Sequence, residues 1–141
     1  MDSLLAQINE VLKLNIDSND TLEIWRYDLI YKIIVPESGW DAVQEALFQI
    51  LLDDSRKQDE YTVISQVFWE AVCDKLTVDK DRAVALLNYR LNTADRPYED
   101  NLTWSITCNL YHLDYADSEY NAFRDEKIRS LLAGYGITYE L

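Results

Sequence analysis

The sequence predicts an all-α fold, and two observations indicate this class. Apolar residues recur at intervals of three and four along almost the whole chain, which is the spacing of one helix face. Residues that interrupt helices are scarce, because the 141 residues include only three glycines and two prolines. A chain of this length fits one domain. We therefore expect a single domain over residues 1–141, built as an irregular helical bundle or a short helical solenoid of about seven helices.

The N-terminal part of the chain predicts two helices separated by a loop. The first follows the apolar spacing of residues 4–12, and the polar residues 15–20 form the loop. Asp20 and Glu23 have the spacing of a capping box, so the second helix is expected to begin there and to end at Pro36. The stripe that this helix would bury consists of Leu22, Trp25, Leu29 and Ile33.

The middle of the chain predicts three more helices. Ser38 is the expected N-cap of the third helix. Its buried residues would be Val43, Ala46, Leu47, Ile50 and Leu51. A fourth helix is expected over residues 60–76, after a charged loop at 53–60. Asp79 is expected to cap the fifth helix. The buried face of that helix would hold Ala83, Val84, Leu86, Leu87 and Leu91.

The C-terminal third predicts two helices around an irregular stretch. The sixth helix follows a break at residues 94–99, and its apolar stripe consists of Leu102, Ile106 and Leu110. Residues 111–121 are polar and aromatic and are expected to be irregular. A seventh helix is predicted over residues 124–133, with Gly134 just beyond its end. Residues 134–141 are expected to form an extended or flexible tail.

The two cysteines and the N-terminus bear on the cellular compartment. Cys73 and Cys108 each lie in an apolar helical pattern, so we expect buried free thiols, with a disulfide or a reactive thiol as the alternative. The first residues lack the basic and apolar parts of a signal peptide, and no apolar run is long enough to cross a membrane. These features predict a cytoplasmic protein.

No assembled catalytic or metal-binding set is evident, and we expect neither an enzyme nor a cofactor. His112 is the single histidine, and it is expected to be exposed or to lie at a helix end. One histidine and two distant cysteines do not have zinc-ligand spacing, and residues 114–119 lack the glycine and the final glutamate of a calcium loop. Catalysis by a pair of carboxylates stays open, because it needs only geometry.

The charge distribution indicates the kind of partner. The chain carries 26 acidic and 13 basic residues, a net charge of −13, which argues against binding to nucleic acids or to anionic membranes. The excess of acids lies in the first and last thirds, and the last third also holds six of the ten tyrosines. Acids beside tyrosines are typical of a surface that binds a basic protein. The residues predicted to form this surface are Tyr98, Glu99, Asp100, Trp104, Asp114, Tyr115, Asp117, Glu119 and Tyr120.

Three segments carry a family resemblance. Residues 100–106 (DNLTWSI) and 114–120 (DYADSEY), together with 84–91 (VALLNYRL), resemble small acidic immunity proteins of bacterial polymorphic-toxin and contact-dependent inhibition systems. The resemblance covers residues 60–132. It implies a compact cytoplasmic inhibitor that binds one cognate toxin domain. Many such toxins are basic nucleases, so an acidic inhibitor would cover a surface meant for nucleic acid. It implies no individual contact residue.

The leading hypothesis is therefore an immunity protein that neutralises a cognate toxin, expected to be basic, through the acidic, tyrosine-bearing surface. The alternative is a non-enzymatic helical adaptor or regulatory subunit that binds a host protein. The sequence leaves open whether the chain acts as a monomer or as a dimer.

Overall fold

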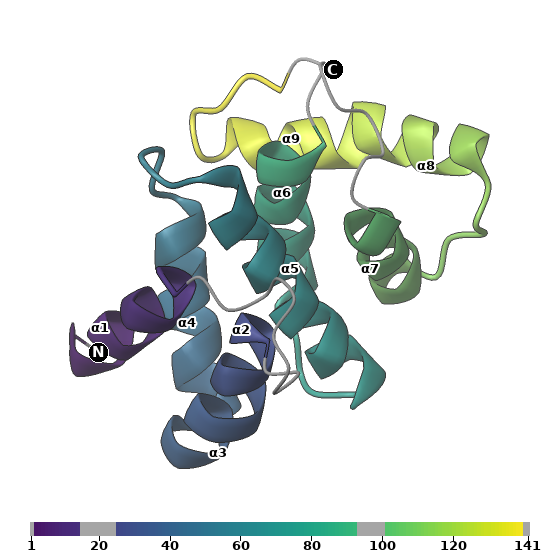
Figure 1. Cartoon of the computed structure of the whole chain (residues 1–141). Helices are drawn as coiled ribbons and strands as arrows, with labels where there is room; N and C mark the ends of the chain where they lie inside the picture. The colour runs from purple at the N-terminus through teal and green to yellow at the C-terminus, as the bar shows by residue number, and fades with distance from the viewer. Residues whose placement is uncertain (1, 15–24, 93–100, 140–141) are drawn as a thin grey trace.

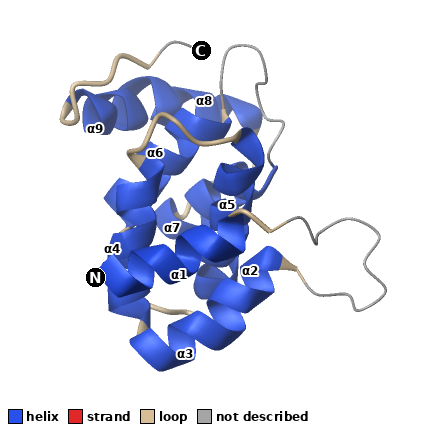
Figure 2. Cartoon of the chain, turned by 60° about the vertical axis from the view of Figure 1, so that its left-hand side comes forward, coloured by secondary structure: helices blue, strands red, loops and turns tan. Residues whose placement is uncertain are grey.

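Helices make up all the regular secondary structure in the computed structural model, which describes residues 2–14, 25–92 and 101–139 (Figures 1 and 2). The predicted all-α class is confirmed. Five helices of the described residues are α1 (Asp2–Leu12), α4 (Trp40–Leu51), α5 (Gln58–Cys73), α6 (Lys80–Leu91) and α7 (Asn101–Tyr111). Two further helical rods are continuous, and in each the hydrogen-bonding pattern changes from α-helical to π-helical and back.

The first composite rod joins α2 (Arg26–Asp28), the π-helical segment η1 (Leu29–Ile34) and α3 (Val35–Ser38). The prediction that Pro36 ends this helix is wrong. Pro36 stands in the first turn of α3, and a first-turn position has no need of the N–H that proline lacks. The rod continues to Gly39, where a positive φ of 89° turns the chain into α4.

The predicted buried stripe of this rod is wrong at Trp25 and Ile33, while Leu29 is half-buried. Leu22 and the predicted capping box of Asp20 and Glu23 lie outside the described residues. Trp25 and Ile33 are 43% and 51% exposed, whereas Ile30 and Ile34 lie in the core. A second set of residues, Tyr27, Ile30, Tyr31 and Ile34, has helical spacing too, and this set packs on the core. The Tyr31 hydroxyl donates a 2.5 Å hydrogen bond to Asp74 beyond α5. Packing against α5 thus selects between two stripes that the sequence presents equally.

Helices α4 and α6 follow their predictions closely. All five residues expected to be buried in the third helix are buried in α4, although α4 begins after Gly39 and not after Ser38. Asp79 caps α6 as expected, because its side chain accepts a hydrogen bond from the Arg82 backbone N–H at 3.5 Å. Its predicted inward residues are also buried.

Helix α5 starts and ends earlier than predicted. It begins at Gln58, and its last helical residue is Cys73. Lys75 then adopts a left-handed conformation with φ 59°, and backbone N–H groups of Lys75 and Leu76 bond to the carbonyls of Val72 and Ala71. This is the Schellman pattern that closes a helix C-terminus.

The core centres on α5 and α6. Helix α5 contacts α2, α6 and α7, and α6 contacts α4, α5, α7 and α9, so these two helices join the N-terminal and C-terminal parts (Figure 1). The larger apolar cluster contains residues of α1, η1, α4, α5, α6 and α7. A smaller cluster lies under the C-terminal rod and contains Val84, Ala85, Ile128, Leu132 and Tyr139.

The second composite rod corrects the prediction for residues 111–121. Helix α8 (Asp117–Phe123) continues through η2 (Arg124–Ile128) into α9 (Arg129–Ala133), so only residues 112–116 are irregular. The rod closes with a second Schellman pattern in which Gly136, with φ 73°, holds the left-handed position that Gly134 was expected to occupy. Residues 137–139 are extended, and Tyr139 is buried.

Candidate functional site

The connection between α7 and α8, with the facing part of α7, brings together five of the predicted partner-binding residues. We name Trp104, Asp114, Tyr115, Asp117 and Glu119 the acidic corner. His112 leaves α7 with a left-handed φ of 56°, and the Leu113 N–H donates to the Cys108 carbonyl at 3.0 Å. The Asp114 N–H then donates to Glu119 at 3.2 Å. These hydrogen bonds tie the irregular segment to both of the helices that it joins in Figure 1.

An aromatic pair lies at the centre of the acidic corner. The rings of Trp104 and Tyr115 meet edge to face, with centroids 5.2 Å apart and planes at 80°. Trp104 is half-buried in α7, whereas Tyr115 is 55% exposed. The Asn109 side-chain amide donates to the Tyr115 hydroxyl. Tyr115 is therefore an exposed aromatic ring that its neighbours hold in place.

The carboxylates around this pair have no basic neighbour. Asp114, Asp117 and Glu119 are all exposed, and no Lys or Arg of the described residues lies within ion-pair distance of them. Asp117 and Glu119 also stand in the first turn of α8, where negative charge is favourable. The acidic corner thus combines three exposed carboxylates with the exposed ring of Tyr115.

The arginines explain why acids dominate the free surface. Each of the six arginines among the described residues is in an ion pair and is wholly or partly buried. The closest pairs are Arg26–Asp59 at 3.0 Å, Arg56–Glu60 at 3.0 Å, Arg82–Glu45 at 2.6 Å, Arg90–Asp54 at 2.8 Å, Arg124–Asp125 at 3.0 Å and Arg129–Asp125 at 3.6 Å. The guanidinium groups of these six arginines are therefore paired with carboxylates of the same chain.

Tyr120 does not belong to the surface that was predicted for it. Its side chain is fully buried, because it lies on the inner face of α8 and reaches α6. Its hydroxyl donates to Asn88 and accepts a 2.7 Å hydrogen bond from Asn92. Tyr98, Glu99 and Asp100 lie outside the described residues.

A buried polar network extends around Tyr120, and sequence reasoning missed it. The Asn88 side chain donates to Thr107 on α7 at 3.1 Å, and Asn92 donates to Asn88 at 2.8 Å. The Tyr139 hydroxyl donates to the Asn92 carbonyl at 2.8 Å. The available signal was a pair of asparagines four residues apart on the inward face of an apolar helix. The network connects α6, α7, α8 and the C-terminal segment.

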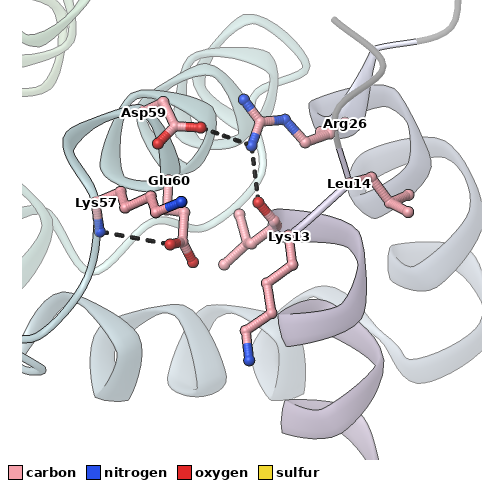
Figure 3. A pocket seen from close by; sticks show the side chains of 7 residues that line it. Lys13, Leu14, Arg26, Lys57, Asp59 and Glu60 are labelled. Carbon is pink, nitrogen blue, oxygen red and sulfur yellow. Dashed lines mark hydrogen bonds and ion pairs between the residues drawn. The ribbon is translucent and has the colours of Figure 1, made fainter.

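A pocket of about 480 Å³ forms a second candidate site, between the C-terminal end of α1 and the N-terminal end of α5 (Figure 3). It is lined by Leu12, Lys13, Leu14, Arg26, Lys57, Asp59 and Glu60. Arg26 crosses it, donating to the Leu12 carbonyl at 2.7 Å and to Asp59 at 3.0 Å. Sequence reasoning missed this pocket too, because its residues come from three separate parts of the chain.

The remaining chemistry-bearing residues are dispersed. His112 is exposed at the end of α7, as expected. Both cysteines are free; Cys108 is buried as predicted, but Cys73 is exposed because it ends α5 on the outer side. Burial, followed by the negative charges of Glu70 and Asp74, raises the pKa of the Cys73 thiol. Within residues 2–14, 25–92 and 101–139, no group of three His, Cys, Asp or Glu side chains is placed to hold a metal ion.

Comparison with known proteins finds no match: no protein-family model, no curated protein and no solved structure is similar to this chain. None of the helices in the described part of the chain has the length and apolar character needed to cross a membrane.

Proposed function

We propose that this chain is an immunity protein that binds and neutralises a basic toxin domain, expected to be a nuclease, through the acidic corner. One observation carries the proposal. Three exposed carboxylates without a basic partner among the described residues lie within five residues of Tyr115, an exposed ring that Trp104 and Asn109 hold in place. Opposite charges steer a partner toward such a surface, and the aromatic ring then supplies contact area.

The order of the corner supports binding without prior rearrangement. Hydrogen bonds tie residues 112–116 to α7 and to α8, and Trp104 backs the Tyr115 ring. A surface that is already ordered loses less side-chain and loop entropy when a partner arrives. The buried hydroxyl of Tyr120 fixes α8 against α6, so the carboxylates of Asp117 and Glu119 stand on a fixed helix.

The toxin part of the proposal is supported by charge and by the family resemblance of residues 100–106 and 114–120. A nuclease binds phosphates through lysine and arginine side chains. The chain has a net charge of −13, and the six arginines that the structure describes are paired with carboxylates of the chain itself. Its free carboxylates can therefore occupy the phosphate-binding surface of such an enzyme. The proposal places the reaction chemistry on the partner.

The test is affinity capture from the source cells with three forms of the protein. The first is the wild type, and the second is a triple amide variant, Asp114→Asn, Asp117→Asn and Glu119→Gln. Each amide has nearly the shape of the carboxylate, keeps one hydrogen-bonding oxygen, carries an NH2 group in place of the other and removes the negative charge. The matched control removes three exposed carboxylates elsewhere on the chain, through Glu10→Gln, Glu37→Gln and Asp41→Asn.

The expected result is one basic protein that the wild type and the control retain, that the triple amide variant releases, and whose activity is suppressed while bound. A bound protein whose activity is unchanged would instead indicate the adaptor function. Equal capture by all three forms would show that the acidic corner is not the binding surface.

A further inference from the structure

We propose that the pocket between α1 and α5 binds a small organic anion, a phosphate or a carboxylate carried on an apolar body. This inference is independent of the proposed function, because the pocket and the acidic corner share no residue. The pocket volume of about 480 Å³ falls within the range of small-molecule sites. A smaller hollow of about 230 Å³ adjoins it and shares Lys13 and Glu60.

Basic residues outnumber acidic ones around these two hollows, although the chain as a whole has twice as many acids. The basic residues are Lys13, Arg26, Arg56 and Lys57, and the acidic ones are Asp53, Asp59 and Glu60. The chain thus gathers four of its 13 basic residues here. Such a concentration favours an anionic ligand.

The acids of the pocket are already satisfied by protein groups. Asp59 pairs with Arg26 at 3.0 Å, and Glu60 pairs with Arg56 at 3.0 Å. Glu60 also accepts the backbone N–H of Lys57 at 3.4 Å (Figure 3). A cationic ligand would therefore have to displace an existing ion pair, whereas an anion would not.

Two ammonium groups remain for a ligand. Lys13 and Lys57 are exposed, and neither has a carboxylate within ion-pair distance among the described residues. They stand on different elements, one after α1 and the other directly before α5. Lysine carries a compact charge on a flexible stem, so both ammonium groups can turn toward an anion held between them.

The pocket also offers an apolar wall. Leu14 is 42% exposed, one of the few large apolar side chains with that much exposure among the described residues, and it lies on the pocket lining with Leu12. An apolar body on the ligand would cover the Leu14 side chain and remove it from water. The combination of paired ammonium groups and a leucine wall distinguishes an organic anion from an inorganic one.

The net charge of −13 does not forbid this site. At physiological salt the Debye length is about 8 Å, so acids on the far side of the molecule are largely screened. The charges that matter lie within the pocket, where each carboxylate has its own basic partner.

The experiment is isothermal titration calorimetry at constant ionic strength with four probes. Phenyl phosphate and benzoate carry an anionic group on an apolar ring. Inorganic phosphate lacks the ring, and phenol lacks the charge. The proteins are the wild type, the double variant Lys13→Gln and Lys57→Gln, and a matched control with Lys32→Gln and Lys80→Gln, two exposed lysines outside the pocket.

We expect saturable binding of phenyl phosphate or benzoate to the wild type and to the control. The double variant should bind about tenfold or more weakly, because two charge-assisted contacts are lost. Inorganic phosphate, which lacks the ring, and phenol, which lacks the charge, should each bind more weakly than phenyl phosphate. Absence of saturation at millimolar concentration, or equal affinity in the double variant, would overturn the proposal. Neither outcome bears on the acidic corner.

Discussion

Among the described residues, two that are not glycine adopt a left-handed conformation, and both end a helix. Lys75 has φ 59° after α5, and His112 has φ 56° after α7. A Cβ atom makes this conformation cost about 1–2 kcal/mol, which is why glycine usually holds the position. The sequence does not mark Lys75 as a helix end, so the predicted end of α5 fell three residues too late.

The substitution Lys75→Gly is therefore expected to stabilise the protein by about 1 kcal/mol, because glycine adopts a positive φ without a steric penalty. The measurement is the midpoint of urea unfolding followed by circular dichroism. Lys75→Ala is the control, since it also removes the charge but keeps the Cβ atom. A gain of the same size from alanine would mean that charge, and not backbone conformation, is responsible.

The two thiols differ in access. Cys73 is exposed and Cys108 is buried, and burial raises the pKa of both. We expect a thiol reagent to modify one cysteine per native chain, at Cys73, and to reach Cys108 only after denaturation. The Cys73 reaction should be slower than that of a free thiol at the same pH, since Glu70 and Asp74 disfavour the thiolate. Mass spectrometry of the labelled peptides checks the assignment; native labelling of Cys108 would refute it.

For single elements, the helical conformation could be predicted from the sequence, but the face that a helix buries could not be predicted in every case. The buried stripes of α4 and α6 were predicted correctly because one set of apolar residues dominates each helix. The rod formed by α2, η1 and α3 has two apolar stripes, and only contacts with α5 decide between them. The prediction at Pro36 failed for a related reason. In the sequence, a proline in the first turn of an α-helical segment that follows a π-helical one cannot be told from a proline that ends a helix.

Helix α8 was hidden in a stretch read as irregular, because tertiary contacts hold it. Replacing Tyr120 by phenylalanine removes the hydroxyl that bonds to Asn88 and Asn92 in the core. The substitution should cost about 1–3 kcal/mol of unfolding free energy, since buried amide groups lose a partner. Tyr115→Phe, at an exposed position, is the control and should change stability by less than about 0.5 kcal/mol. Equal effects of the two variants in urea unfolding would argue against the buried network.

For the whole molecule, the class of fold and the negative net charge of the surface could be predicted from the sequence. The sequence did not disclose where the basic residues go, because their partners are distant in sequence; Arg26 and Asp59 are 33 residues apart. The same is true of the two candidate sites. The acids of the corner were predictable as an acidic stretch, but the burial of Tyr120 and the pocket at α1 and α5 depend on how helices pack.

Alkaline pH should destabilise the whole molecule through its tyrosines. The pKa of Tyr31 is raised by burial and then by the hydrogen bond to Asp74, and burial also raises the pKa of Tyr61 and Tyr27. A phenol with a raised pKa in the folded state contributes stability fully below its unfolded pKa of 10.0 and loses it as the pH rises further. The melting temperature should fall above pH 10, and less steeply in Tyr31→Phe. An unchanged slope in that variant would contradict the assignment.

The central claim is that the acidic corner steers a basic partner, and association kinetics test it most directly. The measurement compares the wild type, the triple amide variant and its matched control against the captured partner, at low and at high salt. We expect the triple amide variant to associate about tenfold or more slowly at low salt, with a shallower salt dependence, whereas its dissociation rate should change less. An association rate equal to that of the wild type at both salt concentrations would contradict the claim.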